Sequence, residues 1–194
     1  MPKLETERLV LRPFRGADAG EFARLSGDWA VASMTSDIPY PFSAAQAMGW
    51  LKPVRGEARF AIELDGQLIG GAGYYRRTSG AAELGFWLGR AWWGQGYATE
   101  ATRAVVRYGV SNRRLPGYSS AHFVDNPASA RVLHKLGFEQ VGRGRIACAA
   151  RGCDVEVITY WLDRKRAALT APPLAAAIAE PPRWRAWLGR LGLA

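Results

Sequence analysis

Two glycines, Gly94 and Gly96, bracket Gln95 where the sequence changes from a strand pattern to a helix pattern. A helix start leaves backbone N–H groups without partners and is the positive end of the helix dipole. Glycines remove the Cβ atoms that would hold a ligand away, and they allow a positive φ. The expected chemistry is binding of phosphate oxygens by the N–H groups of Gln95, Gly96, Tyr97 and Ala98. So short a pattern also fits a turn without a ligand.

The elements that would position this loop are a strand before it and a helix after it. Apolar residues occupy every second position from residue 84 to 88, which is typical of a strand. They then recur at helical spacing from residue 98 to 108. The chain contains neither G-x-x-x-x-G-K-[ST] nor G-x-G-x-x-G, so a P-loop and a dinucleotide fingerprint are excluded.

Five segments follow one another along about residues 4–163: L-E-T-E-R-L-V-L-R-P at 4–13, D-I-P-Y-P at 37–41, G-Q-L-I-G-G at 66–71, W-W-G-Q-G-Y-A-T-E-A at 92–101 and N-P-A-S-A-R-V-L-H-K-L-G-F at 126–138. In this order they resemble the GNAT acetyltransferases, above all the RimJ/RimL branch of ribosomal-protein N-terminal acetyltransferases. The family's Q/R-x-x-G-x-G/A signature maps to Trp93, Gly96 and Ala98. Trp93 therefore stands where the family has Gln or Arg.

The resemblance implies an α/β (α+β) fold, with a mixed, mostly antiparallel twisted sheet of about seven strands flanked by about four helices. It implies transfer of an acetyl group from acetyl-CoA, the co-substrate, to a primary amine, without a metal. A protein N-terminal α-amine is the first acceptor class. The alternatives are a small amine (a polyamine, an aminoglycoside or an amino acid) and a non-catalytic acyl-CoA-binding module.

The family places the cofactor's pantetheine arm in a gap beside the central strand. By position, Trp87 and Leu88 would offer backbone groups to this arm, and the Leu88 N–H would polarise the acetyl carbonyl. The loop from Gly94 to Thr99 would hold the phosphates. Asn126 stands where the family commonly has a cofactor-contacting Asn, and it also suits an ordinary turn before Pro127.

Acetyl transfer to an amine needs a base for the amine and an acid for the leaving thiolate. Glu83 is the first candidate for the base, through a water, and His122 is the second because His suits proton transfer near neutral pH. An exposed strand Glu and a structural His fit these positions as well. The resemblance makes Ser129 the candidate acid, since the Tyr found in many family members is Leu133 here. The alternative is a Ser with a local backbone bond.

The acceptor site is expected beside the loop before the second helix. In this branch that loop faces the peptide N-terminus, so Tyr40 and Phe42 would wall the site. Asp37 would attract a cationic amine. The alternatives are aromatic side chains that cap the core and an Asp that belongs to a turn.

The composition fits one globular domain, since 194 residues suffice for one core. The net charge of +9 favours polyanionic partners such as a phosphorylated cofactor, RNA or the ribosome surface, and equally fits an arginine-rich proteome. No RNA-binding motif is present. Cys148 and Cys153 flank a turn and are expected to be free thiols, without a zinc site. A cytoplasmic protein is expected, because no apolar run spans a membrane and the N-terminus is not a secretory signal.

The predicted helices and strands follow from the spacing of apolar residues and from capping and turn residues. Helices are expected from a capping pair at Asp18 and Glu21, from another at Ser43 and Gln46, over the stretch after Gly96, and from Pro127. Strands are expected at residues 8–14, 59–64, 67–75, 83–88, 118–124, 138–148 and 154–162. Asp65-Gly66, between the second and third of these strands, predicts a two-residue hairpin turn.

The last part of the chain differs in composition from the rest. Residues 1–166 are expected to form the acetyltransferase domain, 167–182 an Ala/Pro-rich linker, and 183–194 a basic amphipathic segment. This segment would bind a partner or a membrane surface, or else pack on its own domain or on a second subunit in a homodimer.

Overall fold

The computed structural model describes residues 1–77, 80–111 and 115–171. One eight-stranded sheet in the order β1-β2-β3-β4-β5-β6-β8-β7 forms its centre. All neighbouring strands are antiparallel except the pair β5 and β6. The strands are β1 (Leu4–Glu5), β2 (Val10–Pro13), β3 (Glu57–Leu64), β4 (Gln67–Arg76), β5 (Ala82–Leu88), β6 (Gly117–Phe123), β7 (Glu139–Cys148) and β8 (Cys153–Asp163). The expected mixed, mostly antiparallel sheet is confirmed, with one short strand more than the seven expected.

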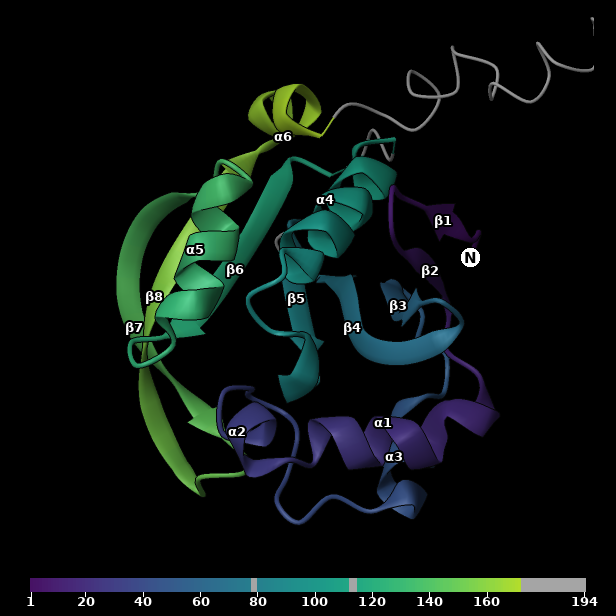
Figure 1. The fold of residues 1–194 in the computed structure, drawn as a ribbon. Coiled ribbons are helices and arrows are strands. Elements are labelled where there is room, and N and C mark those ends of the chain that lie inside the picture. Colours follow the sequence, from purple (N-terminus) through teal and green to yellow (C-terminus); the bar gives the residue numbers. More distant parts are fainter. Residues whose placement is uncertain (78–79, 112–114, 172–194) are drawn as a thin grey trace, which may run out of the picture.

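Helices cover both faces of this sheet (Figure 1). One layer holds α1 (Ala19–Ser26), α2 (Trp29–Ala32) and α3 (Ala44–Trp50), and the other holds α4 (Tyr97–Val110), α5 (Pro127–Lys135) and α6 (Arg164–Thr170). The four expected helices correspond to α1, α3, α4 and α5. The short helices α2 and α6 were not predicted.

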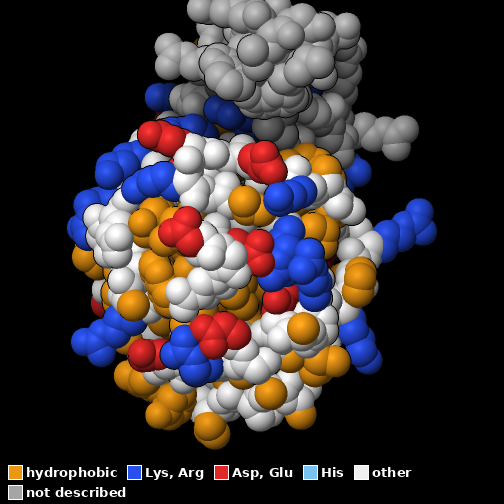
Figure 2. Space-filling model, turned by 45° about the vertical axis from the view of Figure 1, so that its right-hand side comes forward, with side chains coloured by type: hydrophobic (Ala, Val, Ile, Leu, Met, Phe, Trp, Pro, Cys, Tyr) orange, Lys and Arg blue, Asp and Glu red, His pale blue; other side chains and the backbone are white. Residues whose placement is uncertain are grey.

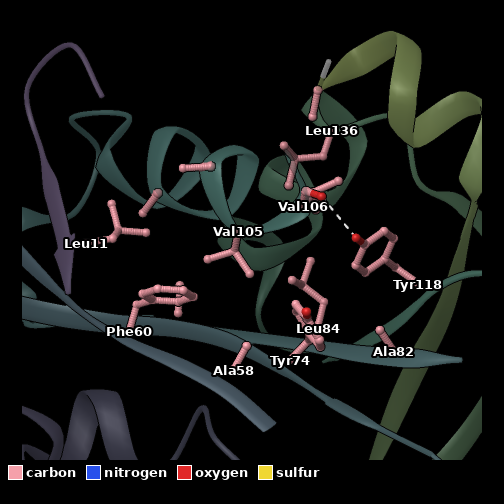
Figure 3. Packing of buried hydrophobic residues seen from close by; sticks show 14 of the residues in the cluster. Leu11, Ala58, Phe60, Tyr74, Ala82, Leu84, Val105, Val106, Tyr118 and Leu136 are labelled. Atoms are coloured by element: carbon pink, nitrogen blue, oxygen red, sulfur yellow. Dashed lines mark hydrogen bonds between the residues drawn. The ribbon is translucent and has the colours of Figure 1, made fainter. Parts of the chain in front are cut away.

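The larger core lies between the sheet and α4. Val105 and Val106 of α4 are fully buried against Phe60 and Leu84 of the sheet (Figure 3). The hydroxyl of Tyr118 in β6 donates a hydrogen bond to the carbonyl oxygen of Val106 at 3.0 Å. Burial raises the pKa of this phenol well above its usual value. The core thereby fixes α4, and with it the loop that precedes this helix.

The opposite face of β5 carries Trp87, whose side chain points toward α1. Its ring centroid lies 5.2 Å from that of Phe22 in α1. Leu84 and Leu88 belong to the core under α4, so successive side chains of β5 alternate between the two layers as the period of two predicts.

Two of the predicted local signals are confirmed in the turns and caps. The β3–β4 hairpin turns at Asp65 and Gly66, both with positive φ (50° and 80°), as a type I′ turn requires. Ser43 and Gln46 form the reciprocal capping box of α3.

The capping pair predicted at Asp18 and Glu21 is wrong. The Asp18 side chain makes no cap hydrogen bond to α1. Its oxygens accept instead from the guanidinium of Arg12, at 2.7 and 2.8 Å, and from the backbone N–H of Arg15 at 2.7 Å, in the 3-10 turn before α1. Arg12 also donates to Glu63, at 2.7 Å. Burial alone would raise the pKa of Asp18, but the hydrogen bonds from Arg12 outweigh it and hold that pKa below its usual value.

The folded part extends past the expected boundary at residue 166. Residues 167–170 belong to α6 rather than to a linker, and Ala167 and Ala171 are fully buried in the core beside α4. The rest of the expected linker and the basic segment 183–194 lie outside the described residues. Over the described ranges, no helix is long and apolar enough to cross a membrane.

The surface mixes charges of both signs. On the face near β1 and β2, turned forward in Figure 2, Lys and Arg side chains lie among Asp and Glu side chains. Exposed and half-buried charges of the described residues also form ion pairs, among them Arg8 with Glu100 and Arg59 with Glu57. The net positive charge therefore does not gather into one basic patch on this face.

Candidate functional site

The central feature of the site is the separation of β5 from β6. The two parallel strands pair at Ala82 with Tyr118 and at Glu83 with Ser119. Beyond Glu83 the described structure contains no further ladder pair between them, whereas β5 stays paired with β4 as far as Leu88. The Ser120 hydroxyl donates to the Leu84 carbonyl oxygen at 3.0 Å, at the apex of this V-shaped separation.

The backbone of β5 presents two N–H groups to the opening. Gly89 N–H donates to Ile69 O at 2.9 Å, which makes the register pair of Gly70 and Leu88 a non-hydrogen-bonded pair. The Leu88 N–H and C=O therefore point away from β4, toward the opening, as expected of this residue. Phe86, two residues earlier, has the same orientation. Sequence analysis missed Phe86, because only the strand register reveals it.

Trp87 does not belong to this set of backbone groups. It alternates with Phe86 and Leu88 and lies opposite Gly71 of β4, so its N–H and C=O point toward β4. Its side chain packs on α1. The structure thus gives Trp87 a packing role, which was the alternative to the expected cofactor contact.

The glycine loop has the conformation that its sequence predicts. Gly94 and Gly96 have φ values of 77° and 85°, and Gly96 is the N-cap of α4. The first helical hydrogen bond runs from Glu100 N–H to Gly96 O, at 3.1 Å. The N–H groups at the helix start before it are those of Tyr97, Ala98 and Thr99. With exposed Gln95 and the two glycines, they form a cradle of backbone donors at the positive end of α4.

Trp93 connects this loop to the end of β5. Its indole N–H donates to the Leu88 carbonyl oxygen at 2.8 Å. The ring remains 45% exposed. The residue that replaces the signature's Gln or Arg thus fixes the backbone of Leu88 relative to the loop.

The N-terminal segment also reaches the loop, which no sequence pattern indicated. The Glu100 carboxylate accepts from the Thr6 hydroxyl at 2.6 Å and from the Arg8 N–H at 2.9 Å. The Arg8 guanidinium contacts Glu100 as well, and it donates to Gln95 O at 3.1 Å. Burial alone would raise the pKa of Glu100, but the Thr6 and Arg8 hydrogen bonds hold it below its usual value.

The start of α5 lies at the end of β6. Asn126 is the N-cap of α5, and its side-chain oxygen accepts from the Ser129 N–H at 3.1 Å. The side-chain oxygen of Asn126 thus serves its own helix, as in an ordinary cap. The half-buried Ser129 hydroxyl has no hydrogen-bond partner among the described residues. Leu133 is fully buried in the core, so position 133 offers no acid.

Glu83 lies on the α1 side of the sheet, next to Tyr75 of β4 in the register. Its carboxylate forms an ion pair with Arg77. Burial raises the pKa of Tyr75, Arg77 opposes this rise, and the charges of Asp37 and Glu57 add to it.

His122 does not lie on the Glu83 side of the sheet. It is buried in β6 on the face opposite to Glu83, because Ser119 pairs with Glu83 and His122 lies three residues further. Its Nδ1–H donates to Phe123 O at 2.7 Å, and its Nε2 accepts from the Tyr160 hydroxyl at 3.2 Å. Both ring nitrogens are used, which is the arrangement of a structural histidine.

The comparisons with known proteins agree with this architecture. The family model of the GNAT acetyltransferase domain matches residues 8–139. The chain belongs to the GNAT acetyltransferase family. The uncharacterized N-acetyltransferase YoaA of Bacillus subtilis is 34% identical over 175 residues, which cover 85% of this chain and 98% of YoaA. The uncharacterized N-acetyltransferase p20 of Bacillus licheniformis is 30% identical over 173 residues, which cover 84% of this chain and 96% of p20.

Solved structures share the fold of this acetyltransferase. RimL, a ribosomal L7/L12 α-N-protein acetyltransferase in complex with coenzyme A, aligns with a TM-score of 0.72 at 17% identity, over 84% of this chain and 98% of RimL. Mycobacterium smegmatis RimJ in complex with CoA-disulfide aligns with a TM-score of 0.69 at 18% identity, over 88% of this chain and 93% of RimJ. Family membership makes the chain an acyltransferase.

The acetyltransferase carries an exposed aromatic pair near the expected acceptor side. Tyr40 and Trp29 are about half exposed, at 52% and 49%, with ring centroids 5.1 Å apart. Phe42 instead packs edge-on against Phe22 in the smaller core under α1, with the centroids 5.5 Å apart. Phe42 therefore caps the core, which was the alternative to a role in the acceptor site, while Tyr40 faces solvent.

The loop that leads to Tyr40 is held on the β7–β8 turn of the acetyltransferase. Arg151 donates to Ser33 O at 2.7 Å and pairs with Asp125 at 2.8 Å. A cavity of about 490 Å³ lies between this loop and the turn, lined by Ser36, Asp37, Ala147, Cys148, Ala149, Gly152, Cys153 and Asp154. Both cysteines are free thiols. Among the described residues, no group of three or more His, Cys, Asp and Glu side chains is placed to hold a metal.

Proposed function

We propose that this chain transfers the acetyl group of acetyl-CoA to a primary amine. The observation that carries the proposal is the pair of N–H groups at Phe86 and Leu88 facing the β5–β6 opening, directly beside the glycine cradle. Such an arrangement suits a ligand with phosphates at one end and a carbonyl at the other. Acetyl-CoA has this form and supplies a reactive acetyl thioester.

The residues of the chain take separate roles in this proposal. The cradle from Gly94 to Thr99 binds the phosphates, and the Leu88 N–H stabilises the negative charge that develops on the carbonyl oxygen. Glu83, oriented by Arg77, accepts the amine proton through a water. As the carbon–sulfur bond of the thioester breaks, the hydroxyl of Ser129, at the start of α5, donates a proton to the leaving thiolate and regains one from water.

The proposed acceptor is the N-terminal α-amine of a protein, in the manner of the ribosomal-protein acetyltransferases. The exposed rings of Trp29 and Tyr40 support this choice, because they offer an open surface on which a peptide can lie. RimL, which shares the fold, carries the name of a ribosomal L7/L12 α-N-protein acetyltransferase. A cytoplasmic location and a homodimer formed through residues 183–194 belong to the same proposal.

A small amine is the second candidate acceptor. The cavity that Asp37 lines contains a second carboxylate, that of Asp154. Two carboxylates suit a molecule with two cationic amines, such as a polyamine.

The experiment is a measurement of CoA release from acetyl-CoA with a panel of N-terminal peptides, polyamines and aminoglycosides. Turnover with peptides supports the first acceptor class, and turnover with small amines alone moves the assignment to the second. Mass spectrometry of the product locates the acetyl group on the α-amine or on a side chain. Failure of acetyl-CoA to bind in calorimetry would overturn the donor assignment.

A further inference from the structure

Arg8 lies at the rim of the glycine cradle, although it belongs to the segment between β1 and β2. The carbon atom of its guanidinium lies 4.5 Å from the ring centroid of Tyr97, the first residue of α4. A Cβ atom added at Gly96 would lie 3.4 Å from Nη2 of Arg8. The charged group therefore borders the same glycine that caps α4.

The contacts of Arg8 fix this position and leave donors free. Its Nε and Nη2 face the Glu100 carboxylate, at 2.7 and 2.6 Å, and Nη1 donates to Gln95 O at 3.1 Å. A guanidinium has five N–H groups, so two remain beyond these three contacts. The side chain is 42% exposed. An anion that reaches the cradle therefore meets an oriented guanidinium edge.

Glu100 does not cancel the effect of this charge. Its carboxylate is already satisfied by Thr6, by the Arg8 backbone and by the Arg8 side chain. It lies on the inner side of Arg8 and is only 16% exposed. The outer edge of the guanidinium stays open to solvent, where a planar donor fork suits phosphate oxygens.

The family signature has Gln or Arg at the position of Trp93, and a tryptophan supplies no charge. The Trp93 N–H is moreover used by the Leu88 carbonyl. We propose that Arg8 binds the diphosphate of the acetyl donor, and that it supplies from the N-terminal segment a cationic contact that the uncharged loop from Gly94 to Thr99 does not provide. This inference rests on the proposed use of acetyl-CoA.

The test compares acetyl-CoA with a donor that lacks its 3′-phospho-ADP part, which contains the diphosphate. Arg8→Gln is expected to raise the Kd for acetyl-CoA about tenfold, as the loss of one charge-assisted hydrogen bond predicts. S-acetylpantetheine carries the same thioester without the diphosphate, and its kcat/KM should stay within about twofold of the wild-type value. A merely structural Arg8 would lower the activity with both donors alike, and that result would overturn the inference.

Two controls separate charge from structure. Thr6→Val removes another hydrogen bond to Glu100 and leaves Arg8 in place, so it should lower the thermal midpoint without changing the Kd for acetyl-CoA. Arg145→Gln removes an exposed arginine on β7, and it should leave that Kd unchanged. An equal weakening in Arg145→Gln would reduce the effect to net charge and overturn the inference.

Arg8→Lys serves if Arg8→Gln does not fold. Lysine keeps the charge but not the planar fork, so the Kd for acetyl-CoA should rise severalfold and that for S-acetylpantetheine should not. If Arg8→Lys binds both donors with unchanged Kd, the inference about Arg8 is overturned and the proposed function is not affected. A wild-type protein that binds neither donor would instead contradict the proposed function.

Discussion

The indole N–H of Trp93 donates a hydrogen bond to the carbonyl oxygen of Leu88, at 2.8 Å. This bond joins the two parts of the donor site, the end of β5 and the loop before α4. The Leu88 carbonyl and the Leu88 N–H point to the same side of the strand. A side chain that holds the carbonyl therefore also sets the direction of the N–H that faces the β5–β6 opening.

Trp93→Phe tests this positioning role. It keeps an aromatic ring and removes the donor, so the strand end and the loop lose one hydrogen bond, worth about 1 kcal/mol. The expected result is an increase of about fivefold in the KM for acetyl-CoA with a smaller change in kcat. Steady-state kinetics with the donor varied measures it. A fall in kcat alone would place the contribution of Trp93 in the chemical step instead.

Gly96→Asp tests the phosphate cradle. The change adds bulk and a negative charge where the phosphates are proposed to lie, and it strains a backbone with φ of 85°. Calorimetry should detect no binding of acetyl-CoA. Gly56→Asp is the control for backbone strain, because Gly56 has φ of 89° and a Cβ atom added there would meet nothing within 4 Å. It should bind acetyl-CoA normally, whereas loss of binding in both variants would show a general effect of strain.

The sequence predicted the elements around the site well because their signals are local. The β3–β4 hairpin follows from Asp65-Gly66, and the start of α5 follows from Pro127, which needs no N–H at that position. The glycine loop follows from the switch between the two periods. The two-residue strand β1 and the helix α6 lack such signals, since tertiary contacts stabilise them.

The site itself was predicted only in part. The orientation of the Phe86 and Leu88 N–H groups depends on the register with β4, which no single segment encodes. The contact of Arg8 with the loop joins residues 87 positions apart. Asp18 looked like a helix cap because its buried partner Arg12 belongs to a different element. All three features depend on pairing between residues of different elements, which local periodicity does not reveal.

Glu83→Gln tests the proposed base. The amide has nearly the same shape but cannot accept the amine proton, so kcat should fall about a hundredfold, the usual contribution of a general base. The Kd for acetyl-CoA should not change, because Glu83 lies on the α1 side of the sheet, away from the cradle. A variant that keeps its kcat across the pH range would remove Glu83 from the mechanism.

His122→Asn tests the structural role of the histidine. The Asn amide can replace the Nδ1–H that donates to Phe123 O, but it does not reach the Tyr160 hydroxyl. Stability should therefore fall by about 1 to 2 kcal/mol in urea unfolding. The kcat and its pH profile should remain those of the wild type. A change in the pH profile of kcat in His122→Asn would contradict a purely structural role and make His122 a candidate base again.

Asp18→Asn tests the buried ion pair of Arg12. The pKa of Asp18 is lower in the folded protein than its ordinary value of 3.8, so the pair stabilises the fold above that pH, and the contribution is lost as the pH falls through the folded value. Near neutral pH the variant should lose about 3 kcal/mol, because the Arg12 guanidinium remains buried without one of its carboxylates. Urea unfolding between about pH 7 and pH 3 should show the two proteins converging at the acid end. A stability difference that stays constant over this range would mean that the cost comes from packing rather than from charge.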